Sequence, residues 1–180
     1  MRVAILTVSD RCSRGEAEDS TGPALREALT AAGAEVVEVA LVADDEDRIK
    51  AELVRLSDQI GADVVLTNGG TGLGPRDVTP EATEAVLRRR APGIPEAMRA
   101  QSLVHVPAAM LSRGTAGLRG ATLIVNLPGS PRGAIECLRI VLPVLRHAVE
   151  MIAGVGHEPR TGADGGRTSG ARERSDIAPR

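Results

Sequence analysis

The sequence predicts an α/β fold of three layers, in which helices cover both faces of a mainly parallel sheet. Short apolar, β-branched runs, typical of buried parallel strands, alternate along the chain with amphipathic segments of helical spacing. Polar or glycine-rich loops follow these apolar runs, as in doubly wound sheets. With 180 residues, 42% of them hydrophobic and 26% charged, the chain is long enough for one domain with a substantial core.

Three strand–helix units are predicted in the first half of the chain. The run at 3–8 is continuously apolar, which indicates burial on both faces, whereas the run at 35–42 alternates and is placed nearer an edge. A third strand is expected at 63–67, and a polar loop is expected after residue 8. Helices are expected from Thr21 to Gly33, from Asp44 to Gly61 and from Thr79 onward.

The second half of the chain is less regular. Prolines and a glycine at 92–95 predict a break, and the segment that follows has helical composition. Two short strands are expected on either side of Arg119-Gly120, and a tight loop is expected at 127–131. Apolar residues at helical spacing then predict a long core-facing helix that ends near Ile152 and bends near Pro143. The segment of helical composition spans 96–105, and the two short strands are expected at Leu118 and at 121–125.

Residues 1–158 are predicted to form one α/β domain, because no long linker or internal repeat divides them. Residues 159–180 are rich in glycine, arginine and serine and contain a single isoleucine, so this tail is predicted to be disordered.

Composition argues against several classes of partner. The net charge is -2 and the chain has no phenylalanine, tyrosine or tryptophan, so neither a basic surface nor a stacking platform for nucleic acid is expected. No run approaches the roughly 18 apolar residues of a membrane span. The apolar start at 3–8 is too short for a signal peptide, and the two cysteines, Cys12 and Cys137, imply no disulfide framework. We therefore expect a cytoplasmic protein with neither a nucleic-acid nor a membrane partner.

Common nucleotide and metal motifs are absent from the sequence. A Walker-type phosphate loop ends in Gly-Lys-Ser/Thr, but the only lysine is Lys50, far from the glycine-rich stretch. The three-glycine dinucleotide fingerprint belongs after the first strand, whereas here the glycines follow the third. The three histidines are scattered without the spacing of a zinc site.

The glycine-rich stretch that follows the third strand is the strongest candidate site. Its backbone amides and the helix that starts at Thr79 would bind an oxyanion, and Arg76 would neutralise a phosphate. Asp10, Asp44 and Asp77 follow other strands or end the glycine stretch, and carboxylates are ligands that Mg²⁺ prefers. These loops are expected to converge on one cleft at one edge of the sheet.

Each aspartate also has a structural alternative. Asp44 would serve as a helix N-cap, Asp77 would cap a helix or pair with Arg76, and Asp10 would only solvate its loop. From the residues alone, the prediction is a Mg²⁺-assisted site for a phosphate group in an α/β domain.

Four stretches resemble the molybdenum cofactor biosynthesis family of the MoaB/MogA type. The resemblance spans residues 3 to about 153 with the motifs in the family's order and spacing. They are TVSDR at 7–11, GGTGLGPRDVTPEAT at 69–83, LSR at 111–113 and NLPGSP at 126–131.

The resemblance implies the family's α/β fold and an activity: adenylylation of molybdopterin by Mg-ATP, with release of pyrophosphate. It places the family's two essential aspartates on Asp44 and Asp77, as catalytic residues and Mg²⁺ ligands. It also implies a homotrimer and hand-over of the product to a molybdate-inserting enzyme. Gly70, Thr71 and Gly72 are expected to cradle the pterin phosphate, and the other substrate- or nucleotide-binding residues are expected to be Ser9, Asp10, Gly69, Arg76 and Ser130.

Two other functions remain open from the sequence. The same loops would serve a protein that binds molybdopterin without turnover, and related domains are fused to enzymes that hydrolyse nucleotide diphosphate bonds. The absence of aromatic residues means that neither pterin nor adenine is stacked on an aromatic ring in any of these cases.

Overall fold

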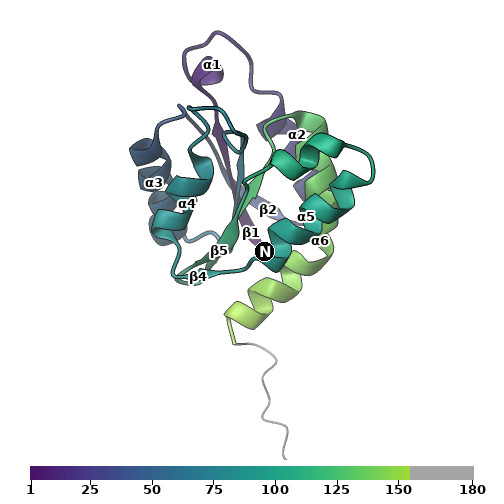
Figure 1. Ribbon diagram of the computed structural model, residues 1–180. Helices are drawn as coiled ribbons and strands as arrows, with labels where there is room; N and C mark the ends of the chain where they lie inside the picture. Colours follow the sequence, from purple (N-terminus) through teal and green to yellow (C-terminus); the bar gives the residue numbers. More distant parts are fainter. Residues whose placement is uncertain (155–180) are drawn as a thin grey trace, which may run out of the picture.

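A computed structural model describes residues 1–154 of the protein (Figure 1). Its sheet has six strands in the order β2-β1-β3-β6-β5-β4. The first four strands in that order run parallel to one another. At the other edge β5 pairs antiparallel with β6, and β4 pairs antiparallel with β5. The prediction of a mainly parallel sheet is therefore confirmed. The strands are β1 (Arg2–Val8), β2 (Glu35–Val42), β3 (Val64–Asn68), β4 (Arg89–Arg90), β5 (Ala116–Arg119) and β6 (Thr122–Leu127).

Helices cover both faces of the sheet, which gives the three predicted layers (Figure 1). On one face α2 (Thr21–Ala31), α5 (Gly93–Leu103) and α6 (Pro131–Ile152) pack against side chains such as Ile5 and Leu66. On the other face pack α3 (Glu46–Val54), the π-helical turn η1 (Arg55–Gln59) and α4 (Thr79–Val86).

Strand burial follows the patterns in the sequence. In β1 every residue from Val3 to Val8 is buried, and all five residues of β3 are buried, because helices lie on both sides of the central strands. Strand β2, with its alternating pattern, lies at the parallel edge of the sheet, as predicted.

Four local features differ from the predictions. The loop after β1 contains a short helix, α1 (Asp10–Ser13), whose first backbone groups are capped by Ser9. Helix α5 begins at Gly93, inside the predicted break, because Pro92 lies at its N-cap and Pro95 in its first turn, where a missing N–H loses no helical bond. The remaining two, β4 and the 3-10 helix η2 (Pro107–Leu111), were not predicted.

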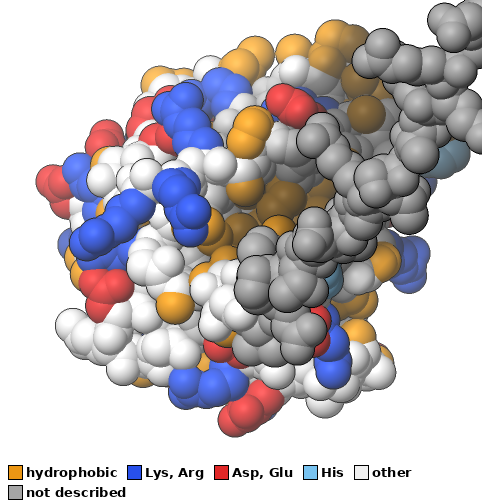
Figure 2. All heavy atoms as spheres, turned by 90° about the horizontal axis from the view of Figure 1, so that it is seen from below, with side chains coloured by type: hydrophobic (Ala, Val, Ile, Leu, Met, Phe, Trp, Pro, Cys, Tyr) orange, Lys and Arg blue, Asp and Glu red, His pale blue; other side chains and the backbone are white. Residues whose placement is uncertain are grey.

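The parallel strands bring the candidate loops to one end of the molecule. The loops after β1, β2, β3 and β6 follow the carboxyl ends of neighbouring strands, at the end of the sheet where α1 lies (Figure 1). At the opposite end, basic, acidic and apolar side chains are interspersed on the part in view (Figure 2). Ligands of open α/β sheets usually bind at the carboxyl ends of the strands, so the α1 end is where a ligand site is expected.

No helix within residues 1–154 combines the length and the apolar character needed to cross a bilayer. The predicted domain boundary at residue 158 and the disorder predicted for 159–180 fall outside the described residues.

Candidate active site

A pair of aspartates ties the loops after β1 and β2 together. The Asp10 backbone N–H donates to Asp44 Oδ2 over 2.7 Å, and the Asp44 backbone N–H donates to Asp10 Oδ1 over 3.1 Å. The neighbouring Asp45, rather than Asp44, caps α3, because its carboxylate accepts from the Arg48 backbone N–H at 2.9 Å. Asp44 therefore does not cap α3, and it lines a hollow at the end of the sheet.

Glycines allow the stretch after β3 to lie directly against β1 and Asp44. Gly69 and Gly70 have φ values of 98° and 62°, in the region that favours glycine. A Cβ on Gly69 would lie 2.2 Å from the Val8 carbonyl oxygen. One on Gly70 would lie 2.3 Å from Thr79 Oγ1 and 3.0 Å from Asp44 Oδ1. The Thr79 hydroxyl is buried without a hydrogen-bond partner among the described residues, so an unused polar group lies beside Asp44 at this point.

Asp77 closes the glycine-rich stretch. Its Oδ2 accepts from the Gly74 backbone N–H at 2.7 Å, and its own backbone N–H donates to the Gly74 carbonyl at 3.0 Å. The proposed pair between Arg76 and Asp77 does not form. Instead, Arg76 donates from Nε and Nη2 to the two carboxylate oxygens of Asp10, each over 3.0 Å.

Asp44 and Asp77 line one hollow, which we call the polar hollow. It has a volume of about 330 Å³, and Asp19 also contributes to its wall. Asp19 accepts from the backbone N–H groups of Thr21 and Gly22 and from the Thr7 hydroxyl, so its carboxylate is already used to start α2. The ends of the strands and the loops that follow them contribute Ser9, Asp44, Asn68, Gly69, Gly70 and Asp77 to the wall.

The carboxylates around this hollow differ in their electrostatics. Burial raises the pKa of Asp44 above its ordinary value, and the negative charges of Asp10 and Asp77 raise it further. The Arg76 guanidinium lowers the pKa of Asp10 by hydrogen bonding to its carboxylate. Ionisation of Asp44 therefore costs free energy in the folded protein, and a bound cation would offset this cost.

The donors of the polar hollow suit Mg²⁺. Within residues 1–154, no three acidic, cysteine or histidine side chains are grouped so that they would hold a metal ion by themselves. Mg²⁺ usually takes only one or two carboxylates, because waters and substrate phosphates complete its octahedral shell. Asp44 and Asp77 fit that requirement in donor type and number.

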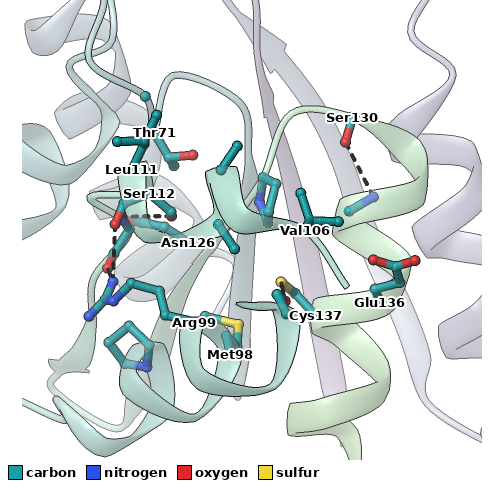
Figure 3. A pocket seen from close by; sticks show the side chains of 18 residues that line it. Thr71, Met98, Arg99, Val106, Leu111, Ser112, Asn126, Ser130, Glu136 and Cys137 are labelled. Atoms are coloured by element: carbon teal, nitrogen blue, oxygen red, sulfur yellow. Dashed lines mark hydrogen bonds between the residues drawn. The ribbon is translucent and has the colours of Figure 1, made fainter. Parts of the chain in front are cut away.

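A second hollow, which we call the apolar cavity, adjoins the same stretch (Figure 3). It has a volume of about 270 Å³ and lies between α5, η2, the end of β6 and the start of α6. Polar groups occur at a few points of its wall, among them the hydroxyls of Ser102 and Ser112. Its apolar wall includes Met98, Val106, Leu111 and Cys137.

Of the ten predicted site residues, eight line one of the two hollows. Arg76 and Asp10 bind one another and line neither hollow. The polar hollow takes Ser9, Asp44, Gly69, Gly70 and Asp77, while the apolar cavity takes Thr71, Gly72 and Ser130. The predicted single cleft is therefore two neighbouring hollows, and Gly70, Thr71 and Gly72 do not face the same one.

Sequence reasoning missed most of the apolar cavity. Three of the four motif stretches contribute to its wall, but Met98, Val106 and Cys137 lie outside every motif and come from segments far apart in the chain. For Asn68 and Asp19 a local signal existed: Asn68 directly precedes the glycines, and Asp19 lies two residues before a Thr-Gly-Pro helix start.

Comparison with known proteins identifies the family of the chain. Residues 4–147 match the family model described as a probable molybdopterin binding domain. The molybdopterin adenylyltransferase of Helicobacter pylori is 43% identical over 156 residues, which are 86% of this chain and 89% of the relative. The protein of that name in Escherichia coli is 44% identical over 140 residues, which are 77% and 72% of the two chains. The crystal structure of the molybdopterin biosynthesis enzyme MoaB from Thermus thermophilus superposes with a TM-score of 0.81 at 54% identity and covers 85% of this chain and 96% of its own.

Proposed function

The chain belongs to the molybdopterin-binding domain family, and on that premise we propose that it adenylylates molybdopterin with ATP and releases pyrophosphate. One observation carries the proposal: Asp44 and Asp77 line a polar hollow, and the glycine stretch beside them continues into the wall of an apolar cavity. A hollow suited to phosphate groups and a cavity suited to a planar heterocycle lie side by side, which supports the proposal.

The apolar cavity is assigned to the pterin. A concave, largely apolar site with a few polar groups is the usual form of a small-molecule pocket. Aliphatic and sulfur-containing side chains such as Met98 and Leu111 would contact the ring faces, in place of aromatic stacking. The Ser102 and Ser112 hydroxyls would hydrogen-bond to the ring edges.

The polar hollow is assigned to the nucleotide phosphates. Asp44 and Asp77 would hold Mg²⁺, which when bound offsets the negative charge of the phosphates. The reciprocal bonds between Asp10 and Asp44 and the Gly74–Asp77 bonds hold both carboxylates in place before substrate arrives.

The reaction needs positioning more than proton transfer. An oxygen of the molybdopterin phosphate attacks the α-phosphorus of ATP, the bond between the α-phosphorus and the bridging oxygen breaks, and pyrophosphate leaves. The nucleophile is already an anion, so no strong general base is required, and no histidine of the described residues lines the polar hollow. The contribution of the chain is to align the two phosphates and exclude water.

Pyrophosphate release, measured with ATP and Mg²⁺ in the presence and absence of molybdopterin, tests the proposal. Release that depends on molybdopterin is the expected result. Absence of release under both conditions would contradict the proposal, and ATP consumption without molybdopterin would indicate a nucleotide diphosphate hydrolase.

A molybdopterin-binding protein without turnover is the second candidate. It is favoured by the fact that neither Asp44 nor Asp77 lines the apolar cavity, so the pterin would bind without them. Equal molybdopterin affinity of the wild type and Asp77→Asn, with no turnover by either, would support this candidate.

We also propose the homotrimer, the cytoplasmic location and the hand-over to a molybdate-inserting enzyme that the family resemblance implies. Exposed apolar side chains on α5, η2 and α6 and the turns beside them, such as Val104, Met110 and Met151, would suit contacts between copies. A single species of three times the chain mass in light scattering is the expected result, and a monomer at micromolar concentration would contradict it.

A further inference from the structure

Arg113 holds the glycine stretch at both of its ends. Its backbone N–H donates to the Thr71 carbonyl at 2.9 Å, and its Nε donates to the Gly72 carbonyl at 2.6 Å. Its Nη2 donates to the Asp77 carbonyl, and its Nη1 pairs with the Glu81 carboxylate in α4. One residue therefore joins the beginning of the stretch, its closing aspartate and the helix that follows.

The segment around Arg113 also forms part of the apolar cavity. Leu111, Ser112 and Gly114 line that cavity, while Arg113 lines neither the cavity nor the polar hollow. Arg99 of α5 fixes the same segment by donating to the carbonyls of Ser112 at 3.3 Å and Gly114 at 3.0 Å. The wall of the apolar cavity and the backbone of Asp77 are therefore connected through Arg113.

We propose that Arg113 is a positioning residue, which sets Asp77 for metal binding by fixing the glycine stretch to the wall of the apolar cavity. It acts through the loop, since it does not line the hollow where Asp44 and Asp77 lie. The metal role of Asp77 rests on the proposed function, whereas the anchoring of the loop does not.

The geometry requires arginine rather than a positive charge alone. Three nitrogens of the guanidinium reach three acceptors, on Gly72, Asp77 and Glu81. A lysine would keep the charge and the pairing with Glu81, but a single ammonium cannot reproduce this planar, forked arrangement. Arg113→Lys therefore separates positioning from charge.

Arg119 provides a matched control. Its guanidinium also binds a carboxylate, Asp58, and a carbonyl at the other end of α4, that of Val86. Arg119→Lys removes a similar set of bonds but leaves the glycine stretch intact. A general loss of stability would affect both variants, while loss of positioning would affect only Arg113→Lys.

The experiment measures loop anchoring and metal binding without turnover. Hydrogen exchange is followed at the Gly74 and Asp77 amides, which bond within the loop, and Mn²⁺ binding is followed by electron paramagnetic resonance. Arg113→Lys is expected to accelerate exchange at these amides and to weaken Mn²⁺ binding about tenfold, as typical losses of outer-shell partners do. Its affinity for molybdopterin without metal is expected to fall by less than the Mn²⁺ affinity, because the cavity wall keeps its Arg99 bonds and the bond from the backbone N–H of residue 113 to the Thr71 carbonyl.

Exchange and Mn²⁺ affinity like those of the wild type, or equal changes in Arg113→Lys and Arg119→Lys, would overturn the proposal. If Arg113→Lys does not fold, Glu81→Gln replaces it, since it weakens one anchor of the guanidinium and is expected to shift both readouts in the same direction. Failure of the wild type to release pyrophosphate would count against the proposed function only, because exchange and Mn²⁺ binding do not depend on turnover.

Discussion

The polar hollow and the apolar cavity adjoin the same two loops but are built in different ways. Gly69 and Gly70 face the polar hollow, while Thr71 and Gly72 face the apolar cavity. The loop after β6 divides in the same manner, with Gly129 and Pro131 on the polar hollow and Pro128 and Ser130 on the apolar cavity.

This difference in construction suggests different functions for the two hollows. The polar hollow is made of strand ends, carboxylates and backbone, all fixed by hydrogen bonds such as those between Asp10 and Asp44. The apolar cavity is made largely of side chains from α5, η2 and α6, with the loops after β3 and β6 completing its wall. We therefore expect substitutions in the first to change the chemical step and substitutions in the second to change pterin affinity.

The largest expected effect is that of Asp77→Asn. Loss of one carboxylate from the polar hollow is expected to lower kcat about 10³-fold, with molybdopterin affinity unchanged within about twofold. Asparagine keeps the acceptor for the Gly74 amide, so the loop is expected to stay folded. Pyrophosphate release and a molybdopterin binding assay measure the two quantities. Asp47→Asn, on the exposed surface of α3, is the control. A kcat of Asp77→Asn within about tenfold of the wild type would contradict the assignment of the chemical step to the polar hollow.

Gly70→Ala tests the close approach on which the polar hollow depends. The new Cβ would lie 2.3 Å from Thr79 Oγ1 at a φ of 62°, so strain and overlap both act. A loss of about 2–3 kcal/mol in the free energy of unfolding is expected, together with loss of turnover. Gly33→Ala is the matched control, because Gly33 has a similar φ of 76° but a Cβ there would have no atom within 4 Å. Only about 1 kcal/mol of backbone strain is expected for it. Equal losses in denaturant unfolding would show that the approach to Thr79 is unimportant.

Ala109→Leu tests the apolar cavity in the same way. The larger side chain would occupy space in the cavity, so the KM for molybdopterin is expected to rise about tenfold, while kcat and the Mg²⁺ concentration for half-maximal rate stay unchanged. Met110→Leu is the control, because Met110 lies on the same turn of η2 but is exposed. A change in the Mg²⁺ dependence of Ala109→Leu would mean that the two hollows are not separable.

The smallest expected effect is a gain in stability from Asp44→Asn. The pKa of Asp44 is raised by burial and by its acidic neighbours, so ionisation at neutral pH destabilises the fold. Removing the charge is expected to increase the free energy of unfolding by about 0.5–1 kcal/mol at pH 7 in the presence of a metal chelator.

The sign of the pH dependence follows from linkage. A carboxyl whose folded pKa lies above its unfolded value loses stability as the pH rises through that range, and is neutral in both states at low pH. The gain in Asp44→Asn should therefore disappear below about pH 4, near the pKa of an unfolded aspartate. Asp45→Asn is the control, because asparagine caps a helix as well as aspartate does. A gain that persists at about pH 3, below the pKa of an unfolded aspartate, would contradict this account.

Much of the fold was predictable from short-range patterns. The central strands β1 and β3 are continuous apolar runs, and burial between two helical layers is the environment that such runs require. Strand β4 could not be predicted, since two exposed arginines carry no periodic pattern and pair only because β5 lies beside them. Helix α5 was predicted to start too late, because prolines were interpreted as a break although they occupy first-turn positions.

By itself, the sequence determined the parallel core and the place of the glycine stretch, because apolar runs, glycines and caps act through neighbouring residues. Only the tertiary structure decided that Arg76 binds Asp10, that Asp44 is bonded to the loop at Asp10, and that the glycine stretch lines two hollows instead of one. These outcomes depend on side chains that are distant along the chain, and packing alone brings them together. The apolar cavity is the clearest example, since each of its walls belongs to a different element.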